Sequence, residues 1–242
     1  MKLLAFETAT EACSVALYLD GEVRERFEVA PRRHAELALP MAQALLDEAG
    51  IARAQLDAIA VGRGPGAFTG VRLAIALAQG IALALDRPVV PVSTLAVLAA
   101  GAPADGPARI LAAIDARMGE VYAGAFGRQG AALVTLDLER VLAPEAVTLP
   151  ESGPAGPWQG VGTGFAAAGG VLHEGRREDA GARFHAEQVG GMVQRGVAVV
   201  AAARVPLGLE HLPRFFGTGR RQWRPSRRMS GAVRPGSECE DR

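Results

Sequence analysis

The chain has 242 residues, of which 49% are hydrophobic and 21% are charged, so it can build a sizeable globular core and is not a disordered chain. No apolar run reaches the roughly 20 residues of a membrane span, because the best candidate, residues 71–85, is short and contains Arg72 and Gln79. Glu7 interrupts the first apolar run, which argues against a signal peptide, and two cysteines are too few for a disulfide framework. We therefore expect a cytoplasmic protein without a membrane segment.

The net charge of zero conceals an uneven distribution. Residues 204–242 contain nine arginines and four acidic side chains, whereas residues 1–203 contain 17 basic and 22 acidic ones. The mildly acidic body has no electrostatic footprint for nucleic acid. The residues leave three readings of the arginine-rich end open: an RNA-binding tail, a solvated disordered tail, or a segment translated in a shifted frame of GC-rich DNA.

The first fifty residues predict three strands and a helix. The strands are expected at residues 3–6, 13–19 and 22–29. The Asp20-Gly21 pair between the last two strands favours a tight hairpin. A helix is expected over 33–49, with a kink or a late start at Pro40 and a stop at Gly50.

Crossover units follow this meander. Strands are expected at 56–61 and 89–92, and helices at 68–85 and 94–100. A glycine-rich segment, residues 62–70, joins the first of these strands to the longer helix. This order of elements is typical of an α/β protein with both hairpin and crossover connections.

The opening pattern repeats after a linker at residues 102–107. Strands are expected at 110–114, 120–126 and 131–136, separated by a polar break at 115–119 and a turn at 127–130. Two halves that each begin with a three-stranded meander indicate an internal duplication. We therefore expect an N-terminal domain at 1–101, a smaller domain at 107–203 and an atypical tail at 204–242.

The glycine-rich segment is the most informative candidate for chemistry. Backbone N–H groups at a helix start attract anions, and glycine allows close approach to them. However, the segment lacks both the Gly-Lys-Ser/Thr ending of a P-loop and the G-x-G-x-x-G spacing. We weight a rigid turn that packs a Gly/Ala-rich helix on its sheet at about two to one over a phosphate site.

Two carboxylates, Glu7 and Asp115, follow the first strands of the two halves. Mg²⁺ prefers one or two carboxylates together with phosphate oxygens, so this pair could hold a metal–nucleotide complex between the halves. Without a third ligand, turn capping is the better interpretation of each. Around His34, only Glu36 stands at metal-ligand spacing, so no metal site is expected there.

The two longer helices carry more small and apolar residues than packing on one sheet requires. The longer helix has two stripes of small residues: Gly70, Ala74 and Ala78 on one, and Ala76, Gly80 and Ala84 on the other. Small residues four apart allow close helix–helix contact. Packing on the helix's own sheet accounts for one stripe, so the second indicates a further contact inside the domain or with a partner.

Four segments, in chain order, resemble the TsaB family, also called YeaZ. They are residues 3–17, 33–40, 62–72 and 114–122. The most specific is Gly-Pro-Gly-x-Phe-Thr-Gly followed two residues later by Arg72. The resemblance is good over about 1–127, loose to about 165 and poor beyond, where the arginine-rich tail replaces the family's usual ending.

The resemblance implies an actin/Hsp70-like (ASKHA) fold of two ribonuclease-H-like halves with mixed sheets. It implies a non-catalytic scaffold that dimerises with TsaD, joined by the ATPase TsaE. TsaD transfers a threonylcarbamoyl group to N6 of adenosine 37 in tRNAs reading codons that begin with A. The tRNA would be met through the complex, and ATP or ADP with Mg²⁺ is expected at the level of the complex, not tightly bound to this chain. A homodimer through the same surface is also implied.

The family's interface is a helix bundle that matches residues 33–49 and 68–85 here. The partner-binding residues implied are His34, Leu37, Met41, Leu45, Phe68, Gly70, Arg72, Ala74 and Leu77. Introducing Arg at Leu37 or Ala74 is expected to weaken TsaD binding and to leave the monomer folded. The residues nearest to any nucleotide are expected to be Glu7, Gly64, Gly66 and Asp115.

An alternative function stays open, an ATP-binding phosphotransferase of the actin/sugar-kinase superfold. It would use Glu7, Asp115 and the glycine-rich segment. Many family members have Asp where Glu7 stands, and TsaD's His-x-x-x-His metal pair is absent from this chain. Whether the isolated chain binds and turns over ATP with Mg²⁺ distinguishes the two functions.

Overall fold

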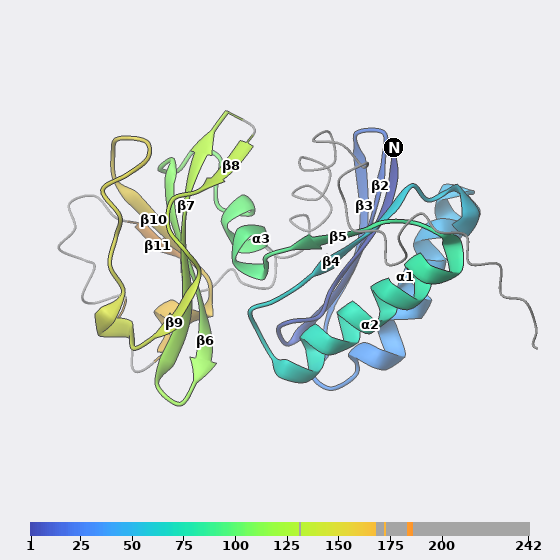
Figure 1. The fold of residues 1–242 in the computed structure, drawn as a ribbon, viewed down its shortest axis with the longest axis horizontal. Helices are drawn as coiled ribbons and strands as arrows, with labels where there is room; N and C mark the ends of the chain where they lie inside the picture. Colours follow the sequence, from blue (N-terminus) through green and yellow to red (C-terminus); the bar gives the residue numbers. More distant parts are fainter. Residues whose placement is uncertain (131, 168–171, 173–182, 186–242) are drawn as a thin grey trace, which may run out of the picture.

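Two β-sheets lie on either side of one short helix in the computed structural model (Figure 1). The structure describes residues 1–130, 132–167, 172 and 183–185. The central helix, α3 (Thr94–Ala100), contacts β6, β7 and β8 of the second sheet, and its side chains share a core cluster with the first. Residues 94–99 are all buried, as expected for a helix that is apolar on every side.

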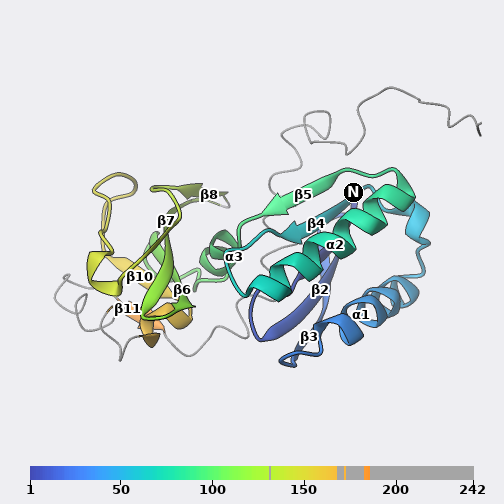
Figure 2. The same ribbon diagram turned by 60° about the horizontal axis from the view of Figure 1, so that its bottom comes forward.

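The first sheet has strand order β3-β2-β1-β4-β5. Its strands are β1 (Lys2–Glu7), β2 (Ala12–Leu19), β3 (Glu22–Val29), β4 (Ala58–Gly62) and β5 (Val89–Val92). The first three strands are antiparallel, β4 runs parallel to β1, and β5 runs parallel to β4. Helices α1 (His34–Ala49) and α2 (Phe68–Leu85) cover one face of this sheet (Figure 2).

The second sheet repeats this arrangement. Its strands are β6 (Arg109–Arg117), β7 (Glu120–Gln129), β8 (Ala132–Thr135), β10 (Trp158–Val161) and β11 (Arg183–His185), with β9 (Arg140–Leu142) also paired to β7. The order β8-β7-β6-β10-β11, with β10 and β11 parallel to β6, is that of the first sheet. The predicted duplication and the actin-like fold of two ribonuclease-H-like halves are therefore confirmed.

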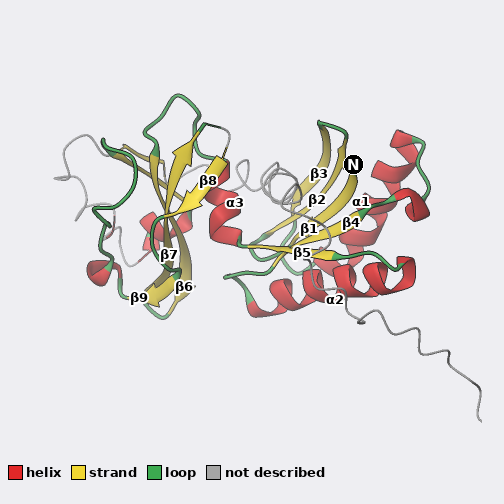
Figure 3. Ribbon diagram, turned by 45° about the horizontal axis from the view of Figure 1, so that its top comes forward, coloured by secondary structure: helices red, strands yellow, loops and turns green. Residues whose placement is uncertain are grey.

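Alternation along the strands separates the layers. On β1, Leu3 and Ala5 belong to the cluster around α3, whereas Leu4 and Phe6 belong to the cluster under α1 and α2. A third cluster covers the far face of the second sheet. Figure 3 shows α1 and α2 on one side of the first sheet and α3 between the two sheets. The three short 3₁₀ helices are η1 (Arg53–Gln55), η2 (Pro144–Ala146) and η3 (Thr163–Phe165).

Several predicted turns are confirmed, since Asp20, Gly21 and Gly50 all have positive φ at 48°, 113° and 65°. The late helix start at Pro40 is wrong, because α1 begins six residues earlier and includes this exposed proline. Proline lacks the N–H that would bond back within the helix, and that bond would lie on the solvent side.

Two predicted breaks in the second half are also wrong. The polar break at 115–119 lies mostly inside β6, which continues through a bulge to Arg117. The predicted turn at 127–130 is mostly strand, because β7 runs to Gln129 and turns at Gly130. A Cβ on Gly127 would lie 3.2 Å from the Leu136 side chain, so glycine serves sheet packing there.

Helix α2 has 18 residues and is apolar enough, by length and composition, to cross a membrane. The helix begins at Phe68, three residues before the apolar run at 71–85 that is by itself too short for a span. Length and composition are weak evidence here, since a core helix passes the same test. Four of its 18 residues are fully buried.

The predicted linker at 102–107 lies between α3 and β6. The domain boundaries themselves stay predictions. The boundary at 203 and the tail at 204–242, with its three readings, lie outside the described residues.

Candidate functional site

The glycine-rich segment packs directly on the turn that follows β1. A Cβ on Gly66 would lie 2.4 Å from the Ala9 carbonyl oxygen, and one on Gly70 would lie 1.9 Å from that of Thr8. The Ala67 N–H donates to the Ala9 carbonyl at 2.7 Å, and the Thr8 hydroxyl donates to the Gly70 carbonyl at 2.7 Å. These glycines therefore serve close backbone packing, the reading that the sequence favoured.

Glu7 is a buried junction between β1, β4 and α3. Its side chain is 1% exposed, and Gly62 passes so close that a Cβ there would lie 2.0 Å from Oε2. Oε1 accepts a hydrogen bond from the Ala9 N–H at 2.7 Å, and Oε2 accepts one from the Thr94 hydroxyl at 2.9 Å. Burial raises the pKa of Glu7, and the hydrogen bonds to Ala9 and Thr94 oppose the rise.

Asp115 lies in a different environment, at the partly exposed end of β6. Its Oδ1 accepts from the Arg117 N–H at 2.7 Å, and its own N–H donates to the Thr163 hydroxyl at 3.2 Å. The Arg117 guanidinium lies 3.6 Å from Asp115 and 3.4 Å from Glu11 of the first half. Asp115 thus caps the hairpin tip, and Arg117 bridges the two halves.

Two cavities flank this bridge. One, of about 330 Å³, lies between the halves and is lined in part by Thr10, Gly66, Phe68, Asp115 and Thr163. The other, of about 410 Å³, lies at the first turns of α1 and α2 and is lined in part by Thr8, Arg32, His34, Thr69 and Gly70. Thr10, Glu11, Ala67 and Arg117 line both. Asp115 and Gly66 thus reach the first cavity, whereas Glu7 and Gly64 line neither.

Gly64 has a structural role as well. Its φ of +88° is a conformation that favours glycine, and a Cβ there would lie 3.3 Å from Val71. The structure therefore does not bring the four residues expected near a nucleotide to one surface. Among the described residues, no three His, Cys, Asp or Glu side chains are grouped so that they could hold a metal ion.

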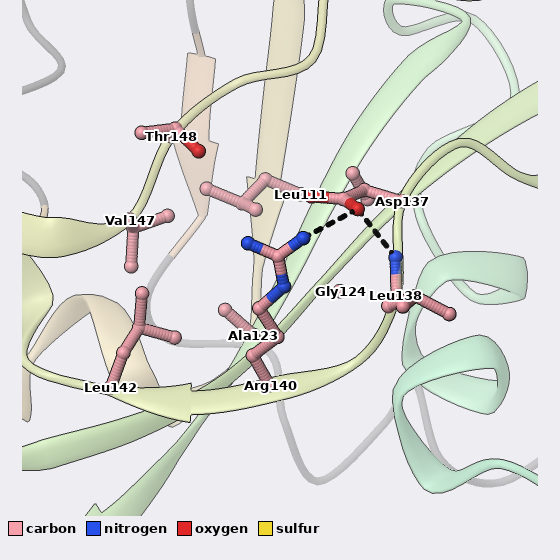
Figure 4. Close-up of a pocket in the computed structure, with 10 residues that line it drawn as sticks. Leu111, Ala123, Gly124, Asp137, Leu138, Arg140, Leu142, Val147 and Thr148 are labelled. Carbon is pink, nitrogen blue, oxygen red and sulfur yellow. Dashed lines mark hydrogen bonds and ion pairs between the residues drawn. The ribbon is translucent and has the colours of Figure 1, made fainter.

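A third pocket, on the second sheet, is too small for a ligand (Figure 4). Its volume is about 20 Å³, which is room for one water molecule. The Arg140 side chain lies across it, and Asp137 accepts hydrogen bonds from this guanidinium at 3.1 Å and from the Leu138 N–H at 2.7 Å (Figure 4).

Three residues expected to bind a partner lie in the core instead. Leu45 and Ala74 are buried between the helices and the first sheet, and Gly70 is buried against Thr8. These three assignments are corrected: Gly70 and Ala74 form the stripe of α2 that faces its own sheet. An Arg at Ala74 would therefore disrupt the monomer.

The other six expected partner residues lie toward the outside. Leu37, Met41 and Leu77 are half-buried at the edge of the core. Phe68 is 67% exposed, and the Arg72 guanidinium stacks on its ring at 3.5 Å. The His34 Nε2 lies 3.0 Å from the Thr10 carbonyl oxygen, at the rim of the larger cavity.

The expected site omitted the outermost stripe of α2. Ala76, Gly80, Leu83 and Ala84 are all exposed, and no atom of the described residues lies within 4 Å of a Cβ built on Gly80. The second small-residue stripe in the sequence was the signal for them. Together with Phe68 and Arg72, these four residues form what we call the outer face of α2.

Comparison with known proteins gives consistent matches. The family model described as "TsaD: tRNA N6-adenosine threonylcarbamoyltransferase" matches residues 27–159. The tRNA threonylcarbamoyladenosine biosynthesis protein TsaB of Escherichia coli (strain K12) is 48% identical over 169 residues, which cover 69% of this chain and 73% of that protein. The protein of the same name from Haemophilus influenzae is 48% identical over 123 residues, half of this chain and 52% of that protein.

A solved structure agrees with these relatives. The crystallised YeaZ from Pseudomonas aeruginosa superimposes with a TM-score of 0.76 and 45% sequence identity. The match covers 86% of this chain and 93% of that one. It therefore extends through both halves of the fold.

Proposed function

The chain belongs to the TsaD-type family and, within it, to the TsaB proteins of tRNA threonylcarbamoyladenosine biosynthesis, and we propose that it serves this modification as a non-catalytic scaffold. In this proposal it dimerises with a TsaD subunit through the outer sides of α1 and α2. TsaE joins the pair, and the tRNA is reached through the complex. We place this assembly in the cytoplasm.

One observation carries the proposal: α2 is strongly apolar, yet only four of its 18 residues are fully buried. Its buried stripe, Gly70, Ala74, Ala78 and Ala82, already covers the sheet. The described residues leave the outer face uncovered, with Phe68 67% and Leu83 60% exposed. An exposed apolar helix face of this kind marks an interaction surface.

The shape of the outer face suits another helix. Ala76, Gly80 and Ala84 are four residues apart and exposed, so a partner helix can approach the α2 backbone closely along this stripe. Leu37 and Met41 on α1 and Leu77 on α2 add half-buried apolar surface beside it. Two helices of this chain and helices of a partner would then form a bundle.

The chemistry of the turn regions supports a scaffold over a catalyst. Residues 7–9 occupy the space beside Gly62, Gly66 and Gly70, where a side chain would otherwise lie. The Ala67 N–H already donates a hydrogen bond to the Ala9 carbonyl. The Glu7 carboxylate is buried and hydrogen-bonded on both oxygens. These groups are engaged in packing and hydrogen bonds within the fold, and Glu7 and Gly62 line neither cavity.

The phosphotransferase remains a second candidate because of one observation. The cavity of about 330 Å³ between the halves has the volume of a small ligand site and presents Thr10, Asp115 and Thr163. Calorimetric titration of the isolated chain with ATP and Mg²⁺ tests this function. Tight binding with turnover and no partner would favour it over the scaffold.

The scaffold is tested by blocking the outer face without touching the core. Ala76→Arg places a long charged side chain on the exposed stripe, whereas Ala146→Arg makes the same change at an exposed alanine of η2. In size-exclusion chromatography with the cognate TsaD subunit, we expect a stable complex for the wild type and Ala146→Arg and none for Ala76→Arg. A homodimer should respond to the same substitution.

Wild-type chain that elutes apart from TsaD at micromolar concentration would refute the pairing. A complex that survives Ala76→Arg would show that the partner docks elsewhere. Circular dichroism of each variant checks that the monomer is folded.

A further inference from the structure

The tip of the β6–β7 hairpin has a strained backbone. Arg117, Met118 and Gly119 have consecutive φ values of +69°, +54° and +81°. Glycine adopts this region freely, but for arginine and methionine it is unfavourable, and left-handed residues normally occur singly. A two-residue hairpin of this type is usually built from Asn-Gly or Asp-Gly.

The surrounding structure holds the tip in this conformation. Asp115 accepts a hydrogen bond from the Arg117 N–H at 2.7 Å, next to a bulge in the β6–β7 register. The Arg117 side chain reaches the first half, 3.4 Å from Glu11. The tip is therefore fixed beside the cavity that Phe68 also lines.

Among the described residues, none packs against the Met118 side chain in this conformation. Its side chain is 98% exposed, although methionine is apolar and adapts readily to binding surfaces. The contacts of Asp115 and Arg117 hold the backbone of the tip, but among the described residues none covers the Met118 side chain, and an exposed apolar residue held in a strained conformation points to a function outside the chain.

We propose that Met118 is a second-half contact of the docking surface and inserts into an apolar pocket of the TsaD-type subunit that covers α2. This inference rests on the proposed function. The cavity of about 330 Å³ is lined by both Phe68 and Arg117, so the tip continues the outer face of α2 across the gap between the halves. One partner can therefore contact both.

The charges around the tip favour a protein over RNA. The Arg117 guanidinium lies within 4 Å of two carboxylates, Glu11 and Asp115, so its charge is locally balanced. RNA phosphates are bound by basic side chains whose charge is not already neutralised by neighbouring carboxylates. An exposed methionine is instead complementary to an apolar pocket of a protein.

The test is Met118→Asn. Asparagine tolerates positive φ better than methionine, so the tip keeps its shape and the melting temperature should be equal or higher. The side chain that fills the partner's pocket is lost, so we expect the Kd for the cognate TsaD subunit, measured by calorimetry on the full chain, to rise at least tenfold. Met118→Gly should behave alike.

The matched control is Leu138→Asn, which removes an apolar side chain that is 74% exposed on the second half. We expect its Kd for TsaD to equal that of the wild type. A wild-type Kd for Met118→Asn would overturn this inference, and if Ala76→Arg still abolished binding, the proposed function would stand. If neither substitution weakened binding, the proposed function would fail as well. If Met118→Asn changed only the self-association of this chain, or only its binding to tRNA, the assignment of a TsaD-type partner would also be overturned.

Discussion

At the level of single residues, burial distinguishes side chains that stabilise the fold from side chains that can bind a ligand or a partner. Glu7 is the last residue of β1 and lines neither cavity, whereas Asp115 lies near the end of β6 and reaches the cavity between the halves. Gly62 leaves room for the Glu7 carboxylate inside the fold, and Thr94 ties it to α3, the helix between the two sheets. The two carboxylates that the sequence singles out thus differ in role: Glu7 is buried between elements of the fold, and Asp115 caps a hairpin tip.

The pKa of Glu7 gives a prediction about stability. Because burial raises it above the ordinary 4.5, the stabilisation from the protonated form is complete below pH 4.5 and is lost as pH rises through the folded-state pKa. Glu7→Gln should remove this loss, so its unfolding free energy should rise relative to the wild type between pH 4.5 and 8. Each unit by which folding raises the pKa of a group corresponds to about 1.4 kcal/mol of unfolding free energy.

Urea unfolding of both proteins at several pH values measures this difference directly. A difference that does not change with pH would show that Glu7 titrates alike in the folded and unfolded chain.

At the level of elements, α2 has two small-residue stripes with opposite tasks. The stripe of Gly70 and Ala74 brings the helix close to the first sheet, and the stripe of Ala76 and Gly80 lies on the outside. Sequence periodicity identifies both stripes but does not tell which one meets the sheet. The family resemblance locates the interface helices without separating their two sides, so Gly70 and Ala74 are among the partner residues it implies.

Alanine substitutions at the two glycines should have opposite effects. Gly70→Ala places a Cβ 1.9 Å from the Thr8 carbonyl oxygen, so we expect a loss of about 1–3 kcal/mol. Gly80→Ala meets nothing within 4 Å and replaces a poor helix former, so we expect a gain of about 0.5–1 kcal/mol. Thermal unfolding of both variants checks the signs, and a destabilising Gly80→Ala would contradict the exposed position of that stripe.

At the scale of the whole molecule, much of the fold could be predicted from the sequence. Periodicity and turn residues predict the bounds of α3 and the three-stranded meander that opens each half. The end of β6 could not be predicted, because a bulge lets polar residues continue a strand. The burial of Leu45 and of Glu7 could not be predicted either, since burial depends on contacts between segments distant in the sequence.

The same reasoning explains why the site was only partly predicted. The resemblance locates the helices, and Phe68 and Arg72 are exposed, so their partner-binding role stays a prediction that the structure allows. The strained exposed tip at Met118 arises from backbone conformation, which a single sequence does not reveal.

The central claim, that this chain serves tRNA modification by docking through the outer face of α2, is tested most directly by its product. Threonylcarbamoylated adenosine 37 is quantified after incubating tRNA, threonylcarbamoyl adenylate, TsaD and TsaE with each form of this chain. We predict product with the wild type and Ala146→Arg, and background levels with Ala76→Arg or with the chain omitted. Wild-type product with Ala76→Arg, or full product without the chain, would contradict the account.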